Sequence, residues 1–150
     1  MGAGPPAPYA AQVTQTPLTA LSASPRVLIV DEDRRVQQSL GDLLRLTGRV
    51  NVIGGATDVR GALESIEREN PDVVIVDPRL PDLEAGAALV ATLESSRPGL
   101  RIVLAGWSVT PEQPELLNSA CSYVSKNGSP EDFIAAVVDA CCAPRDAAAS

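Results

Sequence analysis

Five short apolar runs along the chain constrain its fold more than any other feature of the sequence. They lie at 27–30, 50–53, 73–76, 102–104 and 123–124. Each run is too short for a helix, and the first, VLIV at 27–30, contains no polar residue, which is typical of a strand buried on both faces of a sheet. We therefore expect five buried strands.

Helical patterns separate these runs. They lie between Asp33 and Gly48, from Val59 to before Asn70, over 83–93 and from Ser129 onward. Asp33 and Ser129 are typical N-caps, and Gly48 is a typical helix end. The segment 110–119 contains two prolines, which predicts a short or irregular helix. The alternation predicts an α/β fold, a doubly wound (βα)5 domain with a parallel five-stranded sheet.

The two ends of the 150-residue chain differ in composition from its middle. Residues 1–25 contain five prolines and no charged side chain, so we expect a disordered arm there. A signal peptide is the alternative, but the segment has no basic start and prolines break its apolar residues. We expect one domain over 26–142 and a flexible tail over 143–150.

Charge and residue usage argue against several classes of function. A net charge of −7 and a single lysine disfavour nucleic-acid binding by this chain. Histidine is absent, which excludes histidine-based catalysis and a phosphohistidine relay. No apolar run approaches the roughly 20 residues that span a membrane. Three cysteines, two of them adjacent, argue against a secreted disulfide framework, so we expect a cytoplasmic protein.

Charged side chains come directly after three of the predicted strands. Asp31 and Glu32 follow the first strand, Asp77 the third and Lys126 the fifth. Because ligand sites in such sheets lie beyond the carboxyl ends of the strands, we expect these side chains to meet. Two carboxylates about 4 Å apart repel by roughly 4 kcal/mol at an effective dielectric near 20. We therefore expect Mg²⁺, together with Lys126, to compensate them.

Each of these residues also has a simpler interpretation. An acidic run after a strand often caps a helix, Asp77 before a proline can form a turn, and Lys126 can be a solvated lysine. Their joint position at the strand ends favours a functional site.

Three stretches resemble the receiver domain of bacterial response regulators, the CheY-like fold, and most closely the type found in front of helix-turn-helix output domains. They are VLIVDED at 27–33, PDVVIVDPRLP at 71–81 and SYVSK at 122–126, which SPEDF follows at 129–133. The resemblance covers about 26–142 and implies a flavodoxin-like sheet. It also implies two-component (phosphorelay) signal transduction, with no enzymatic activity beyond self-catalysed phosphorylation and dephosphorylation.

The resemblance assigns roles to individual residues. It implies that Asp77 accepts a phosphoryl group from a sensor histidine kinase, and that Lys126 and the backbone amide of Gly106 contact that group. The residues implied to bind Mg²⁺ are Asp31, Glu32, Asp77 and, through its backbone carbonyl, Arg79.

Three positions depart from the family pattern. Ala105 stands where, in the family, a Ser or Thr hydroxyl bonds the phosphorylated aspartate, so a readout of phosphorylation through Tyr123 should be weak. Tyr123 is then either a switch aromatic or simply a strand-end residue. Glu32 stands where aspartate is usual, and its extra methylene moves the carboxylate outward. Asn127 replaces a proline that follows a cis bond, so we expect a trans bond there.

Arg79 and Trp107 lie at positions that flank the phosphorylation site in the family. We hypothesise that a cation–π contact joins them into a partial lid that slows hydrolysis of the acyl phosphate. The alternative is that Trp107 only covers apolar loop surface.

Three functions fit the sequence to different degrees. The first is a stand-alone receiver that acts on a partner through the surface of its fourth and fifth helices, because few residues follow the last helix. The second is a degenerate receiver that serves as a phosphorylation-independent interaction or dimerisation module. A remote third is a small haloacid-dehalogenase-like phosphatase built on Asp31 and Asp33, but the later motifs of that family are missing.

Overall fold

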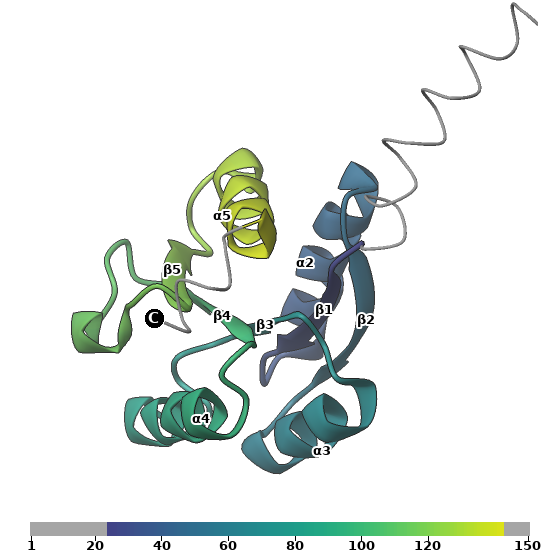
Figure 1. The fold of residues 1–150 in the computed structure, drawn as a ribbon. Helices are drawn as coiled ribbons and strands as arrows, with labels where there is room; N and C mark the ends of the chain where they lie inside the picture. The colour runs from purple at the N-terminus through teal and green to yellow at the C-terminus, as the bar shows by residue number, and fades with distance from the viewer. Residues whose placement is uncertain (1–23, 143–150) are drawn as a thin grey trace, which may run out of the picture.

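The computed structural model describes residues 24–142 as nine regular elements and one short 3₁₀ helix (Figure 1). The strands are β1 Arg26–Val30, β2 Asn51–Ala56, β3 Val73–Val76, β4 Arg101–Gly106 and β5 Cys121–Ser125. The helices are α2 Arg34–Thr47, α3 Val59–Glu69, α4 Leu83–Ser96 and α5 Pro130–Cys142, with the 3₁₀ helix η1 at Pro114–Leu116. Apart from residues 24 and 25, the arm predicted at 1–25 and the tail predicted at 143–150 lie outside the described residues.

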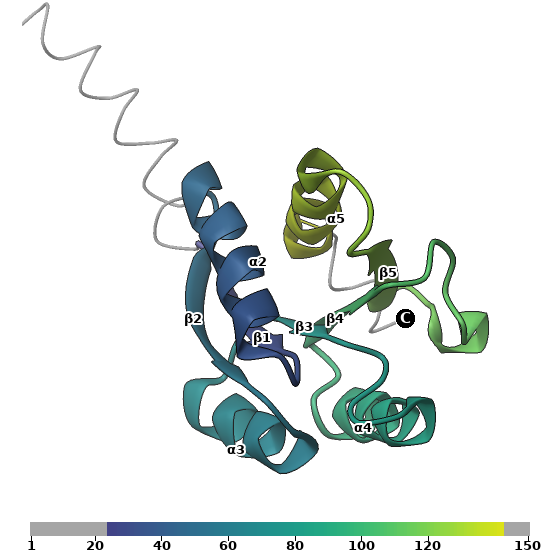
Figure 2. The same cartoon turned by 180° about the vertical axis from the view of Figure 1, so that it is seen from behind.

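All five strands are parallel, in the order β2–β1–β3–β4–β5. Helices α2 and α5 cover one face of the sheet and α3 and α4 the other (Figures 1 and 2). Strand β2 lies on one side of β1 and β3 lies on the other, so the strand order reverses between β1 and β3. The predicted doubly wound, CheY-like α/β fold is confirmed, and its ligand site is expected at this reversal.

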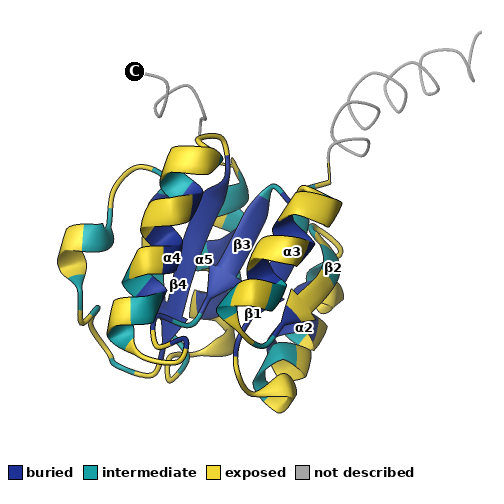
Figure 3. Ribbon diagram, turned by 90° about the horizontal axis from the view of Figure 1, so that it is seen from below, coloured by how far each residue is buried: buried dark blue, intermediate teal, exposed yellow. Residues whose placement is uncertain are grey.

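Alternate strand residues point to opposite faces, which divides the core into two layers. Figure 3 shows the central strands almost entirely buried between the helices. The layer beneath α2 and α5 contains the strand residues Val27, Ile29, Val73, Ile75, Val103, Ala105 and Val124. Two residues further along this alternation come Asp31, Asp77 and Lys126, so all three side chains start from the α2–α5 face.

The helix ends follow the signals read from the sequence. Asp33 accepts a hydrogen bond from the backbone N–H of Arg35 at 2.9 Å and caps α2, which ends at Gly48 with φ 67°. The Ser129 hydroxyl accepts from the backbone N–H of Asp132 at 3.1 Å at the start of α5. Such caps are each worth about 1 kcal/mol, and they fix the loops that carry the strand-end residues.

The prediction that all five strands are buried on both faces is wrong for β2. This strand pairs only with β1, and its residues Asn51, Gly54 and Gly55 are exposed. The other edge strand, β5, exposes Ser122. A run of apolar residues does not reveal whether a strand lies at the centre or at the edge of a sheet, because that depends on the strand order.

The segment between β4 and β5 contains η1 as its one helical turn within the described residues, as its prolines predicted. We call residues 107–120 the β4–β5 connector. The partner surface expected on a fourth and a fifth helix therefore consists of this connector and α5. Pro111 and Pro114 explain why this segment forms no regular helix, because a proline interrupts the backbone hydrogen bonds of an α-helix.

No helix between residues 24 and 142 combines the length and the apolar character needed to cross a membrane. The three cysteines are free thiols, of which Cys121 is buried and Cys142 is exposed.

Helix α4 contacts the loop after β3 at a glycine. A Cβ atom built on Gly86 would lie 1.9 Å from the backbone carbonyl oxygen of Pro78. Real side chains do not approach a backbone this closely, so a glycine is required where α4 crosses this loop. Because Pro78 follows Asp77 directly, this contact holds the loop that carries the carboxylate.

We expect Gly86→Ala to lower the free energy of unfolding by about 1–3 kcal/mol, because the added methyl group overpacks a backbone contact. Urea unfolding followed by circular dichroism measures this. The matched control is Gly41→Ala in α2, where the nearest atoms are the end of the Arg45 side chain at 3.2 Å and a methyl group of Ile29 at 3.7 Å. Equal stabilities of the two variants would contradict the role of Gly86.

Candidate functional site

Two carboxylates and one ammonium group meet at the carboxyl end of the sheet. The Nζ atom of Lys126 donates to Oδ2 of Asp31 at 2.5 Å and to Oδ2 of Asp77 at 2.7 Å. The Lys126 side chain is 2% exposed, and those of Asp31 and Asp77 are 6% and 14% exposed. The predicted meeting of the strand-end side chains is confirmed for these three, whereas Glu32, which was predicted to join them, is exposed.

Backbone geometry fixes both carboxylates. The backbone N–H groups of Asp31 and Asp77 donate to the ends of the neighbouring strands β2 and β1, each at 3.0 Å. Oδ1 of Asp31 accepts from the N–H of Asp33 at 2.9 Å, and Oδ1 of Asp77 accepts from the N–H of Arg79 at 2.8 Å. Each carboxylate therefore has one oxygen bound by its own loop and the other bound by Lys126.

The ammonium group offsets the repulsion that the sequence predicted between the carboxylates. Two buried negative charges at this separation are unfavourable, whereas a buried cation between them with good hydrogen-bond geometry compensates both. Lys126 provides such a cation here. The Lys126 part of the predicted compensation is thus confirmed, and the Mg²⁺ part stays a prediction.

The donor set nevertheless suits Mg²⁺. This ion prefers oxygen ligands and commonly takes one or two carboxylates, with water and phosphate oxygens as the others. Asp31 and Asp77 provide two such carboxylates on one side of the site. Glu32 is exposed, and within residues 24–142 no three Asp, Glu, Cys or His side chains are gathered around one point.

Ala105 lies on the same face of the sheet as Asp77 and is completely buried. It pairs in register with Val124, the second residue before Lys126. Its methyl group packs into the α2–α5 core layer. The site therefore has no hydroxyl donor at this position of β4.

Tyr123 lies on the opposite face of the sheet. Its ring packs against the core beneath α3 and α4, and its hydroxyl donates to the backbone carbonyl of Ser108 at 2.5 Å. A Cβ atom on Gly106 would lie 2.9 Å from the Tyr123 hydroxyl oxygen, so the glycine makes room for the ring. Burial raises the pKa of Tyr123, and the charges of Glu112 and Asp77 add to this. The hydroxyl thus stays protonated and holds the β4–β5 connector.

Arg79 and Trp107 do not form the cation–π pair that the lid hypothesis proposed. The Arg79 guanidinium binds the Glu112 carboxylate with distances of 2.7 and 3.3 Å, and this hydrogen bonding raises the pKa of Arg79. The cation that faces the indole is Lys126, with Nζ 5.1 Å from the ring centroid. Trp107 is 55% exposed, whereas the Lys126 side chain next to it is 2% exposed.

The peptide bond before Asn127 is trans, as predicted, since among the described residues Leu80–Pro81 has the one cis bond. The side-chain amide of Asn127 donates to the backbone carbonyl of Trp107 at 2.5 Å. This bond links the loop after β5 to the connector and places the indole next to Lys126.

Sequence reasoning missed two residues of the site. The side-chain amide of Gln37 donates to the backbone carbonyls of Asp31 and Ala56. Glu112, the partner of Arg79, lies 33 positions from it along the chain. No local pattern marks either residue, because each contact joins segments that are separate in sequence.

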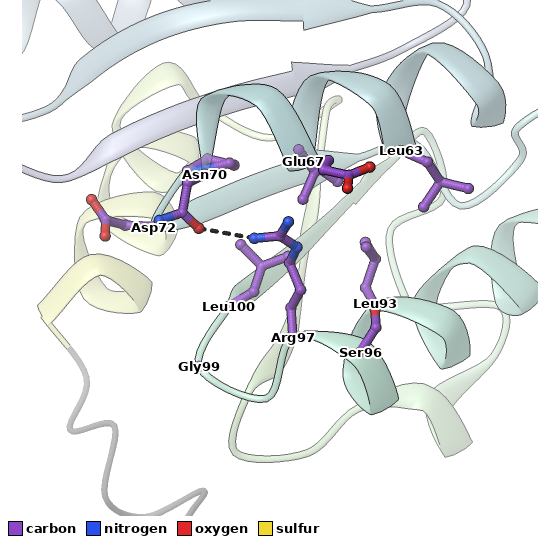
Figure 4. A pocket seen from close by; sticks show the side chains of 11 residues that line it. Leu63, Glu67, Asn70, Asp72, Leu93, Ser96, Arg97, Gly99 and Leu100 are labelled. Carbon is purple, nitrogen blue, oxygen red and sulfur yellow. Dashed lines mark hydrogen bonds between the residues drawn. The ribbon is translucent and has the colours of Figure 1, made fainter.

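A cavity of about 550 Å³ lies at the opposite end of the sheet (Figure 4). It lies between the carboxyl ends of α3 and α4, where the Arg97 guanidinium donates to the Asn70 side chain at 2.9 Å. Asp72 and Leu100, which directly precede β3 and β4, are among its lining residues. The cavity is therefore at the amino ends of the strands, away from Asp77.

Comparisons with known proteins agree with this geometry. The family model described as response regulator receiver domain matches residues 27–138. A probable transcriptional regulatory protein NarL of Mycobacterium tuberculosis is 31% identical over 126 residues, which are 83% of this chain and 57% of that protein. A protein-glutamate methylesterase/protein-glutamine glutaminase of Rhodopseudomonas palustris is 34% identical over 95 residues, 63% of this chain and 25% of that protein. The chain thus spans less than two thirds of these curated relatives.

Solved structures of receiver domains have the same fold as this chain. The signal receiver domain of the putative response regulator NarL from Mycobacterium tuberculosis superposes with a TM-score of 0.68 at 27% identity, covering 79% of this chain and 96% of that one. A CheY-like receiver domain protein from Methanospirillum hungatei superposes with a TM-score of 0.67 at 25% identity, covering 79% and 94%.

We expect Lys126→Met to lower the free energy of unfolding in metal-free buffer by about 3–5 kcal/mol, because it leaves two buried carboxylates without their cation. Thermal unfolding with EDTA present measures this. The matched control is Arg35→Met, which removes the cation of an exposed ion pair with Asp33 at 3.7 Å and should change little. A Lys126→Met protein as stable as the control would contradict the compensating role of Lys126.

Proposed function

The chain belongs to the response regulator receiver domain family, the phosphoacceptor modules of two-component signalling, and we propose that Asp77 accepts a phosphoryl group from a sensor histidine kinase in the presence of Mg²⁺. The observation that supports this most is the shared contact of Lys126 with Asp31 and Asp77. It places a buried cation beside the carboxylate at the reversal of strand order, where this fold binds ligands.

The residues divide the work of phosphoryl transfer as follows. A carboxylate oxygen of Asp77 attacks the phosphorus atom, and the bond from phosphorus to the donor breaks. The N–H of Arg79 holds the other carboxylate oxygen and so orients the attack. Lys126 and the backbone amide of Gly106 bind the phosphoryl oxygens. Positioning and charge neutralisation of this kind account for most of the catalysis in phosphoryl transfer.

Mg²⁺ supplies further neutralisation of the phosphoryl charge when it is bound. Its proposed ligands are Asp31, Glu32, Asp77 and the backbone carbonyl of Arg79. Asp31 and Asp77 lie together already, whereas the exposed Glu32 has to turn toward the ion. Fixing the Glu32 side chain in one rotamer costs conformational entropy, so we expect Mg²⁺ to bind more weakly than it would with aspartate at position 32.

We expect phosphorylation of Asp77 to change the conformation of this domain only weakly. A hydroxyl at position 105 would donate a hydrogen bond to the phosphoryl group, and such a bond to a charged acceptor is worth about 1.5–3 kcal/mol. Ala105 cannot form it. This favours a second candidate function, a receiver-derived interaction or dimerisation module that works without phosphorylation.

We further propose that a downstream partner, or a second copy of the chain, binds the surface made by α5 and the β4–β5 connector. The connector is the segment that both Tyr123 and Arg79 hold, through Ser108 and Glu112. Any change at Asp77 that moves Arg79 therefore reaches this surface directly.

Incubation with acetyl phosphate and Mg²⁺ should add the mass of one phosphoryl group to the protein, and Asp77→Asn should abolish the adduct because it removes the nucleophile. Intact mass spectrometry measures this. The control is Asp139→Asn, an exposed acid of α5 that should leave the adduct unchanged. If the wild-type protein forms no adduct at any Mg²⁺ concentration, phosphoryl acceptance is excluded and the interaction module is left.

We propose that Trp107 slows the loss of the phosphoryl group by covering Lys126. Trp107→Ala should speed dephosphorylation about two- to five-fold, because a cation–π contact of about 0.5–1 kcal/mol no longer holds the cover closed. The rate is followed by phosphate release after removal of acetyl phosphate. Val109→Ala, which truncates an 83% exposed side chain of the same connector, is the control. An unchanged rate in Trp107→Ala would show that the indole only covers loop surface.

A further inference from the structure

We propose that Gln37 is a positioning residue for the acidic loop at 31–33, and that its side-chain amide sets the affinity of this loop for Mg²⁺. The inference rests on the proposed function, because Asp31 is one of the proposed ligands. Gln37 lies near the start of α2, and its amide donates to backbone carbonyls and not to the side chain of a proposed ligand.

The contacts of Gln37 join three elements. Its Nε2 atom donates to the backbone carbonyl of Asp31 at 2.8 Å and to that of Ala56 at 2.7 Å. Both hydrogens of the amide are thereby used. One side chain thus ties the start of α2 to the ends of β1 and β2. A short loop held at both ends in this way has little freedom to shift.

The effect of these bonds extends to the Asp31 carboxylate. The backbone N–H of Asp31 donates to the same Ala56 carbonyl at 3.0 Å, so Gln37 closes a hydrogen-bonded ring that includes both the N–H and the carbonyl of Asp31. From this fixed backbone the carboxylate receives the N–H of Asp33. Metal ligands need distances correct to about 0.2 Å, so a small shift of this backbone is enough to weaken binding.

Gly55 explains how Gln37 can lie there. A Cβ atom at position 55 would be 2.2 Å from Oε1 of Gln37, so any larger residue would push the amide away. Gly55 lies in the edge strand β2 and its φ is outside the left-handed region, so close contacts rather than backbone conformation favour glycine there: the one with Gln37, and one of 2.9 Å that a Cβ atom would make with the backbone carbonyl oxygen of Ile29. The glycine at position 55 thus leaves the space that the side-chain amide of Gln37 occupies.

The test compares Gln37→Leu and Gln37→Glu with the wild-type protein. Leucine keeps much of the side-chain bulk without a donor, and glutamate keeps the shape but carries no N–H group. Gln38→Leu is the matched control, because Gln38 is the adjacent, exposed residue of the same helix. Mg²⁺ binding is followed by the fluorescence of Trp107, the only tryptophan, whose ring centroid lies 5.1 Å from Lys126 Nζ. Isothermal calorimetry provides a second measurement.

We expect both Gln37 variants to raise the dissociation constant for Mg²⁺ by about 10- to 100-fold, as is usual when a residue that orients a metal ligand is lost. Gln38→Leu should bind like the wild-type protein. In metal-free samples, amide hydrogen exchange of Asp31 and Asp33 should be faster in Gln37→Leu than in Gln38→Leu. A purely structural role would lower the unfolding temperature and leave the Mg²⁺ affinity of the folded protein unchanged.

Two outcomes overturn the inference in distinguishable ways. If the wild-type protein and Gln37→Leu bind Mg²⁺ equally well, the positioning role is refuted and the proposed function stands. If the wild-type protein shows no Mg²⁺ binding by fluorescence or calorimetry, the proposed Mg²⁺-dependent function fails, and the inference fails with it.

Discussion

The buried contact of Lys126 with two aspartates is the interaction on which the rest of this structure depends. Its three side chains come from the ends of β1, β3 and β5, so it closes the carboxyl edge of the sheet across the reversal of strand order. Without the ammonium group the two carboxylates would repel each other in a region that excludes most water. The close approach of Gly86 to Pro78 and the bonds of Gln37 each hold one of these strand ends in place.

The residues proposed for phosphoryl acceptance and the residue proposed for its readout lie on opposite faces of the sheet. Asp77, Lys126 and Ala105 face α2 and α5, whereas Tyr123 faces α3 and α4. A hydroxyl at position 105 is the group that would link the phosphoryl site to the loop after β4. With a methyl group there, the contact of Arg79 with Glu112 links the loop after β3 to the β4–β5 connector. We therefore expect acceptance and readout to be separable properties of this domain.

Most of the fold and the centre of the site could be predicted because they depend on local signals. Apolar runs separated by helical patterns required parallel strands, and Asp33, Gly48 and Ser129 marked helix ends by their own backbone chemistry. The rule for ligand sites in parallel sheets then placed Asp31, Asp77 and Lys126 together. Arg79 was correctly placed beside the site, but its partner was not foreseen, because Glu112 reaches it from a connector without a strong pattern.

By itself the sequence determined which segments form strands and helices and which residue types stand at the strand ends, since these follow from side-chain periodicity and capping. Only the tertiary structure decided that β2 is an exposed edge, that Lys126 rather than Arg79 faces Trp107, and that Gln37 lies in the space left by Gly55. The physical reason is that hydrogen bonds and ion pairs act over about 3–4 Å. Two residues far apart along the chain come within that distance only after the whole sheet has been assembled.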